Sequence, residues 1–215
     1  MKRKMQIILI LAAMVIASTS TNAEIVFDNG EPTILADVGN DVLGRLQADD
    51  FVITQDIFLT GAQFWTLEEN TFAWDGTLEY FVFADASGIP GNIISMGEGQ
   101  NVQRNATGNE TPGGPEYEYS FEFDESVNLI ANERYWFGLH LASEYPSDVL
   151  FHIWWSPSMT GFGSNSYESD GGTLDNWTDS GIHRAFYLEG IPEPVTILLL
   201  GVGGLALVRR VKQRP

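Results

Sequence analysis

Carboxylates are the most numerous groups in this chain that could do chemistry. The sequence has 29 aspartates and glutamates, 11 lysines and arginines, three histidines and no cysteine. Two carboxylates held about 5–9 Å apart could hydrolyse a glycosidic bond, but with so many acids some pair meets that distance by chance. No pattern marks one acid as the proton donor. We therefore predict that the protein is not an enzyme and keep a glycoside hydrolase as the weaker alternative.

Nucleophilic catalysis lacks its usual sequence signals. His140, His152 and His183 each lie in a strand-like segment, and the chain has no Gly-x-Ser-x-Gly elbow and no cysteine nucleophile. Zinc requires convergent histidine, cysteine or carboxylate ligands, and no local spacing supplies them. We expect the three histidines to be ordinary strand residues.

Calcium is the one cofactor that the residue pattern suggests. Asp170, Asp175 and Asp179 lie in a long segment, 156–180, that is rich in glycine, serine, asparagine and aspartate. Oxygen-rich loops of this kind suit calcium, although the spacing differs from that of an EF-hand. We expect no cofactor beyond a structural calcium ion held by these three aspartates.

Exposed aromatic rings could bind carbohydrate by stacking on sugar faces. Of the six tryptophans, Trp74 and Trp177 lie in loop-like contexts and are the candidate glycan contacts. Trp154 and Trp155 are adjacent, so in a strand they point to opposite faces and one of them belongs in the core. A carbohydrate-binding module is therefore the alternative function.

Alternation of apolar and polar residues is the dominant pattern between the two ends of the chain. In 116–124 the aromatic residues occupy the odd positions from Tyr117 to Phe123, which predicts a half-buried strand. Segment 134–141 alternates in the same way but is less polar on its second face. Segments 78–83 and 149–155 are apolar on both faces and predict central strands. Further strands are predicted at 50–54, 57–67, 93–96 and 183–188.

Turn residues separate these strands. Glycine and proline cluster in 85–92 and 107–115, whereas 156–180 shows no clear strand and predicts a long functional or mobile loop. No segment has a sustained helical period. The pattern predicts an all-β protein, an antiparallel two-sheet sandwich that is jelly-roll-like, with an immunoglobulin-like topology as the alternative.

The first 23 residues have the layout of a secretory signal peptide. Three basic residues precede an apolar run, 5–17, and small residues lead to a cleavage point between Ala23 and Glu24. An N-terminal anchor is the alternative, but the run is shorter than the roughly 20 residues that span a bilayer. The absence of cysteine means that an exported body contains no disulfide.

The last 25 residues, 191–215, combine three features in order. A motif of Pro192, Glu193 and Pro194 comes first, and a 14-residue apolar run, 195–208, follows. A run of this length could also form a buried core helix, but the prolines separate it from the body and a basic cluster follows it. We predict a short transmembrane helix with a basic stop at Arg209, Arg210, Lys212 and Arg214.

This tail resembles the PEP-CTERM sorting signal of Gram-negative bacteria, in which a Pro-Glu-Pro motif precedes a short transmembrane helix and an arginine-rich end. The resemblance implies recognition of Pro192, Glu193 and Pro194 by an exosortase, which would remove the hydrophobic tail. The signal peptide layout implies cleavage by signal peptidase. The resemblance of the tail further implies a precursor held in the inner membrane and a final place at the cell surface or outside the cell, in settings of exopolysaccharide and biofilm. A generic tail anchor is the alternative.

The segment between the ends, 24–190, is predicted to be one β-sandwich ectodomain. Loose motifs such as 48–51, 57–65, 88–91 and 134–139 resemble the β-sandwich ectodomains found before such sorting tails. From Glu24 to Pro194 the chain has four arginines and no lysine against all 29 acids, a formal charge of −25. Such a surface repels nucleic acid, which we exclude as a partner.

Overall fold

The computed structural model describes residues 22–33, 40–70, 74–145, 151–170 and 173–193. The predicted signal peptide up to residue 21, the predicted transmembrane helix, Pro194 and the basic stop lie outside the described residues. Residues Ala23–Ile191 form a compact unit. No helix in the described ranges is long and apolar enough to cross a membrane.

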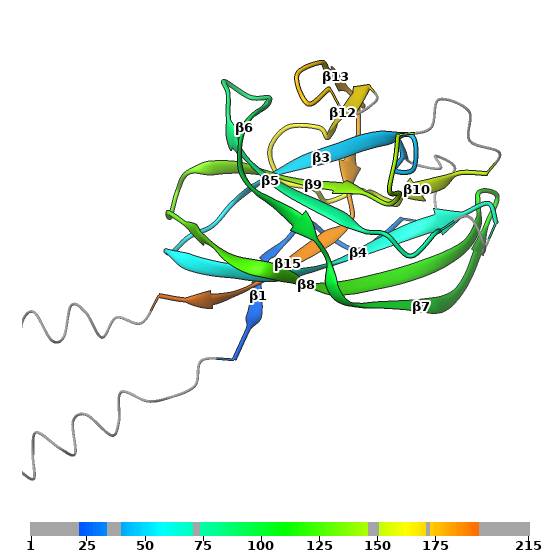
Figure 1. Ribbon diagram of the computed structural model, residues 1–215, viewed down its shortest axis with the longest axis horizontal. Helices are drawn as coiled ribbons and strands as arrows, with labels where there is room; N and C mark the ends of the chain where they lie inside the picture. Colours follow the sequence, from blue (N-terminus) through cyan, green and yellow to red (C-terminus); the bar gives the residue numbers. More distant parts are fainter. Residues whose placement is uncertain (1–21, 34–39, 71–73, 146–150, 171–172, 194–215) are drawn as a thin grey trace, which may run out of the picture. The chain divides into compact units, whose positions relative to one another are not determined.

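The compact unit is built from two antiparallel sheets that face each other (Figure 1). The seven-stranded sheet has the order β1-β15-β4-β10-β2, and β8 extends it from β4 to β7; the six-stranded sheet has the order β13-β12-β3-β9-β5-β6. Strands β11 and β14 form a separate pair. The prediction of an all-β antiparallel sandwich is confirmed.

The bounds of the strands are β1 (Glu24–Asp28), β2 (Asn40–Asp41), β3 (Arg45–Val52), β4 (Ile57–Glu68), β5 (Glu79–Asp85), β6 (Pro90–Glu98), β7 (Gln100–Thr111), β8 (Gly114–Leu129), β9 (Arg134–His140), β10 (Ile153–Trp155), β11 (Pro157–Ser158), β12 (Tyr167–Asp170), β13 (Trp177–Asp179), β14 (His183–Arg184) and β15 (Phe186–Pro192).

Aromatic side chains fill the space between the sheets. Phe137 of β9 packs against Phe123, Trp155 and Phe186, with ring centroids 5.3–6.3 Å apart. These four residues come from both sheets, so their contacts join the two layers. Rings in tilted and edge-to-face arrangements at such distances add to the free energy gained by burying their area.

A second, smaller cluster lies on the outer face of the six-stranded sheet. Phe81, Phe83 and Trp136 are buried there with Leu46 and Ala48, and Trp177 of β13 packs edge-on to Phe83. The prediction that segment 78–83 forms a strand with two apolar faces is thus confirmed by β5. The expectation that 156–180 contains no strand is wrong, because β12 and β13 form a hairpin that adds to β3. These strands have only four and three residues, too few to show a clear alternation.

Several strand limits differ from the expected ones. The predicted strand 50–54 begins five residues earlier, at Arg45, and β7 was not predicted because its side chains are polar and exposed. Strand β10 covers only Ile153–Trp155 of the predicted 149–155, of which 149–150 lie outside the described residues. The alternation in 116–124 and 134–141 correctly located β8 and β9.

Strands β1 and β15 bring the two ends of the compact unit together. They pair antiparallel with Glu24 opposite Gly190 and Asp28 opposite Tyr187. The first strand begins at the residue that would follow signal peptide cleavage, and the last strand ends at the first proline of the Pro-Glu-Pro motif.

Replacing the central ring of the core is expected to be strongly destabilising. Phe137→Ala removes a wholly buried ring that contacts both sheets, and we expect the free energy of unfolding to fall by about 3–5 kcal/mol. Urea denaturation of the purified full chain measures this loss. The matched control is Phe151→Ala at a ring that is 43% exposed, where we expect a change of about 0.5 kcal/mol or less. Equal losses in both variants would contradict the assignment of the core.

Candidate functional site

Two adjacent aspartates on β3 are buried on opposite faces of their sheet. Asp49 and Asp50 are both 0% exposed. Because successive residues of a strand point to opposite faces, Asp49 shares the inner face with Phe51, and Asp50 shares the outer face with Ala48. Each carboxylate therefore needs its own set of donors, and these come from distant parts of the chain.

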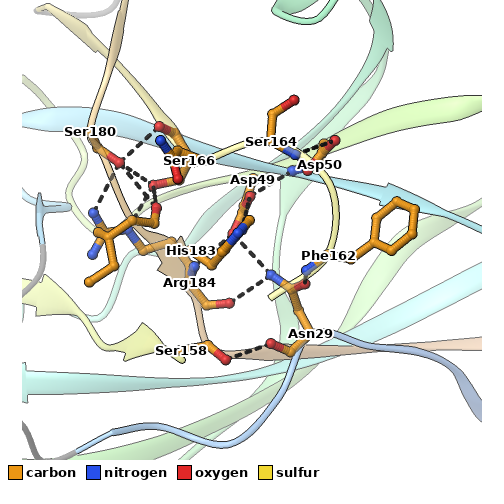
Figure 2. A network of polar contacts seen from close by, with 12 residues as sticks. Asn29, Asp49, Asp50, Ser158, Phe162, Ser164, Ser166, Ser180, His183 and Arg184 are labelled. Carbon is orange, nitrogen blue, oxygen red and sulfur yellow. Dashed lines mark hydrogen bonds and ion pairs between the residues drawn. The ribbon is translucent and has the colours of Figure 1, made fainter. Parts of the chain in front are cut away.

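Asn29 connects the inner aspartate to two other segments (Figure 2). Its Nδ2 donates to Asp49 Oδ2 and to the carbonyl of Arg184, both at 2.9 Å. Its Oδ1 accepts from the backbone N–H of Phe162 at 2.7 Å, and its carbonyl accepts from Ser158 Oγ at 2.7 Å. The side chain is wholly buried, and both the oxygen and the nitrogen of its amide make hydrogen bonds. Asn29 therefore fixes segment 158–162 against β3 and β14.

The outer aspartate holds the next part of the same segment. Asp50 Oδ1 and Oδ2 accept from the backbone N–H of Ser164 at 3.0 and 3.2 Å, and Arg134 Nη1 lies 3.4 Å from Oδ2. Gly163 has φ +74°, and a Cβ atom there would collide with the Asp50 carboxylate. Only glycine permits this close approach.

Burial dominates the electrostatics of the two aspartates. It raises the pKa of Asp50 to about 6, although the Ser164 N–H opposes the shift. It also raises the pKa of Asp49, against the effect of the neighbouring His183. The Asp49 carboxylate in turn raises the pKa of His183, whose Nδ1 lies 3.7 Å from Asp49 Oδ1. Protonation of this group of side chains is therefore coupled to how segment 158–164 is held.

Arg184 completes the network from β14. Its guanidinium is buried and donates to Ser166 Oγ at 3.0 Å, Asn40 Oδ1 at 2.7 Å, Ser180 Oγ at 3.3 Å and the Trp155 carbonyl at 3.2 Å. The backbone N–H of Arg184 donates to Asp49 at 2.6 Å. One side chain thus joins β2, β10 and the segments flanking the β12–β13 hairpin, as Figure 2 shows for the two serines.

An open groove of about 850 Å³ is lined by residues that flank Asn29 and Ser158 of this network in the chain. Its first wall is 28–33, which turns sharply because Asp28 Oδ1 accepts from the Gly30 N–H at 2.7 Å and Gly30 has φ +92°. Its second wall is 158–160, joined to the first by a β-bridge between Pro32 and Ser158. Tyr187 lines the groove between the walls, and the lining residues are Asp28, Gly30, Glu31, Pro32, Thr33, Met159, Thr160 and Tyr187.

The register of β1 and β15 determines which of their side chains line the groove. Asp28 lies opposite Tyr187, so the two side chains share one face of the sheet. The Tyr187 hydroxyl donates to Glu31, and its ring contacts Trp65 edge-on at 5.1 Å. Burial, followed by the Glu31, Asp28 and Glu118 carboxylates, raises the pKa of Tyr187 above its usual range. The groove thus combines a fixed aromatic ring with carboxylates and the apolar surface of Met159 and Pro32.

The predicted glycan contacts Trp74 and Trp177 are half-buried and pack in different clusters. Trp74 Nε1 donates to the Thr77 carbonyl at 2.6 Å, and its ring packs edge-on to Tyr119. Trp177 covers the outer cluster on Phe83, and its buried Nε1 has no hydrogen-bond partner among the described residues. The structure does not bring these two tryptophans together.

The three predicted calcium ligands cannot be compared as a set, because the side chain of Asp170 lies outside what the structure describes. Asp179 Oδ1 accepts from the Gly181 N–H at 2.7 Å, Asp175 is exposed, and only the backbone of Asp170 is described, at the end of β12. Among the described side chains, no group of three or more histidines and carboxylates could hold a metal ion.

The remaining singled-out residues take ordinary positions. His140 is buried, with ring nitrogens 2.9 Å from Glu79 Oε2 and from the Leu43 carbonyl. His152 stacks on Trp154, which is half-buried, whereas Trp155 is wholly buried. The expectation that one of the two adjacent tryptophans belongs in the core is confirmed.

The chain was compared with protein-family models and with curated proteins. No protein-family model matches the chain, and no curated protein matches it significantly.

The groove was not predicted from the sequence. One local signal was available, since Asn29-Gly30 directly follows an apolar segment and Asn-Gly marks a turn. The second wall, about 130 residues later, could not be matched to it from the sequence.

Placing a carboxylate at the centre of the network is expected to be destabilising. Asn29→Asp keeps the shape of the side chain but sets a third acid against Asp49 in place of an amide donor. We expect a loss of about 3 kcal/mol or more in the free energy of unfolding at neutral pH, measured by urea denaturation. The control is Asn128→Asp on an exposed position of β8, with an expected change of about 0.5 kcal/mol or less. A loss at position 29 no larger than the control would refute the central role of Asn29.

The network is also expected to make stability depend on pH. Because the pKa of Asp50 is about 6 in the folded chain and near 3.8 when unfolded, the folded state holds this proton more tightly. Stability therefore falls as the pH rises from about 4 to about 7. His183 adds to the trend, since its raised pKa means that the stabilising charged form is lost as the pH rises.

The measurement is urea denaturation of the full chain at pH 5 and pH 7.5. We expect Asp50→Asn to reduce the loss of stability between these pH values by about 1–2 kcal/mol relative to the unaltered chain. Asp175→Asn, at an exposed position, controls for the general repulsion among the acids and is expected to leave the pH dependence unchanged. The assignment fails if the two variants show the same pH dependence.

Proposed function

We propose that the chain is a non-enzymatic, exported protein of the cell surface or extracellular matrix. In this proposal signal peptidase cuts after Ala23, and an exosortase recognises Pro192, Glu193 and Pro194 and removes the short transmembrane helix and its basic stop. The precursor is held in the inner membrane of a Gram-negative bacterium before the body is released or attached outside, in an exopolysaccharide or biofilm setting.

The position of the motif relative to the fold carries this proposal. The last strand ends at Pro192, so the motif begins where the sandwich ends, and β1 begins at Glu24 on the neighbouring strand. Removing both predicted end segments, 1–23 and 191–215, leaves fourteen of the fifteen described strands intact and shortens only β15, by its last two residues. The acidic, cysteine-free body also suits a protein that stays soluble outside the cell.

Connectivity supports the finer, jelly-roll-like description of the sandwich. Strands β3, β4 and β5 alternate between the sheets, and β6 and β7 are consecutive strands at the ends of different sheets. A chain that repeatedly crosses between two sheets is typical of jelly rolls.

The buried state of the perturbed acids supports the absence of catalysis. A glycosidase uses a carboxyl group of raised pKa as its proton donor in contact with the sugar. Asp49 and Asp50 have raised pKa values, but both are wholly buried beneath segment 158–164. A substrate could not reach either group in this arrangement.

Mass spectrometry of the mature protein tests the proposal. In a Gram-negative host that has an exosortase, we expect a chain that starts at Glu24 and lacks the apolar run 195–208. Changing Pro192, Glu193 and Pro194 to alanine is expected to leave the tail in place and the protein in the membrane fraction. The matched control is Glu189→Ala, a glutamate-to-alanine change on β15 before the motif, which is expected to be processed normally. A mature chain that still ends at Pro215 would contradict the proposal.

A further inference from the structure

We propose that the groove above Tyr187 binds an amine-bearing saccharide, with Asp28 and Glu31 contacting its ammonium group and Tyr187, Met159 and Pro32 covering its apolar faces. The proposal goes beyond export and sorting and rests on the side chains of the body alone.

Negative charge in the groove selects the sign of the ligand. Asp28 and Glu31 are exposed on its first wall, and Glu118 lies near enough to affect Tyr187. No lysine or arginine is among the described residues that line it. The four arginines of the body contact other residues. Arg45 pairs with Glu168, Arg104 with Glu68 and Arg134 with Asp50, and Arg184 belongs to the buried network. An anionic ligand would be repelled, and a cationic group would be attracted.

The apolar part of the lining selects a ligand with a flat hydrocarbon face. Met159 is 68% exposed at the rim, more than any other large apolar side chain of the described residues, and Pro32 lines the groove from the other wall. The Tyr187 ring is held edge-on by Trp65, so its orientation does not depend on the ligand. Aromatic rings stack on apolar ligand faces and attract cations through the ring face.

Hydrogen bonds hold the two walls of the groove in place without a ligand. The first wall is held by the Asp28–Gly30 turn, by the bridge from Pro32 to Ser158 and by the Thr33 N–H, which donates to the Pro157 carbonyl at 2.9 Å. A side chain at Gly30 would collide with Ser158 and Thr160 of the opposite wall. The walls are therefore in place before a ligand arrives, which lowers the entropy lost on binding.

A saccharide fits these features better than a basic peptide. The groove is open and about 850 Å³ in volume, which suits a chain passing through it. Its lining alternates carboxylates and hydroxyls with apolar patches, and a pyranose ring presents hydroxyls at its edge and hydrocarbon on its faces. A lysine side chain would use the carboxylates but would leave most of this pattern unused.

Isothermal titration of the purified full chain with two matched oligosaccharides tests the proposal. The probes are the hexasaccharide of glucosamine and that of N-acetylglucosamine, which share a backbone and differ in the charged amine. At about pH 6 we expect the amine form to bind at least about tenfold more tightly, because hydrogen bonds between charged groups are the stronger ones. Tetralysine serves as a third probe and is expected to bind more weakly than the amine hexasaccharide.

Two variants locate the binding. Glu31→Gln is expected to weaken binding of the glucosamine hexasaccharide by roughly tenfold, whereas Glu110→Gln, an exposed change of the same charge on β7, is expected to change it by less than about twofold. Tyr187→Ala is expected to weaken binding of both hexasaccharides. Circular dichroism confirms that each variant is folded.

Each alternative result overturns the proposal in a recognisable way. Equal binding of the two hexasaccharides would show that the amine is not recognised. Equal binding of tetralysine would show attraction by charge without a saccharide site. Equal losses from Glu31→Gln and Glu110→Gln would show diffuse attraction to the acidic body. Binding is measured on the purified protein, so failure of the sorting proposal would not affect these outcomes.

Discussion

Positive charge is scarce in the body, and the fold depends on where its four arginines lie. Arg104 pairs with the buried Glu68 through two nitrogens and also lies 3.6 Å over the Tyr117 ring, while Arg134 lies against Asp50. Arg184 is wholly buried; its guanidinium donates to Trp155 and Asn40 of the seven-stranded sheet, and its backbone N–H donates to Asp49 of the six-stranded sheet. A carboxylate left buried without donors is strongly destabilising, so the remaining acids must be exposed or supplied with uncharged donors.

Backbone N–H groups and Asn29 supply those uncharged donors, and this requirement shapes the surface. Asp50 accepts from the Ser164 N–H, whereas Asp49 accepts from Asn29, which in turn accepts from the Phe162 N–H; these bonds hold both 162–164 and the segment of Asn29 against β3. Glycine at position 163 is needed because the backbone passes so close to a carboxylate. The groove is the external result of this internal requirement, since both its walls are held by residues whose buried ends satisfy the aspartates.

Local alternation predicted the strands whose two faces differ. Tyr119, Phe121 and Phe123 alternate with polar residues, so the inner face of β8 could be assigned from the sequence. The exposed, polar β7 and the four-residue β12 carry no such contrast, and their places depend on pairing with β8 and β3. The candidate site could not be predicted, because Asp49 and Asp50 accept hydrogen bonds from residues 135 and 114 positions away, respectively.

The pairing of β15 has a mechanical consequence. Strand β15 lies between β1 and β4, so it is hydrogen-bonded along both edges. A force applied to the chain beyond Pro192 and directed along the strand would shear many of these bonds at once, because antiparallel hydrogen bonds lie perpendicular to the strand. A force between the two ends of the body would instead peel β1 from β15 one bond at a time, starting at Glu24 and Gly190. The sandwich is thus built to resist drag transmitted through a single C-terminal tether and to yield when both of its ends are pulled apart.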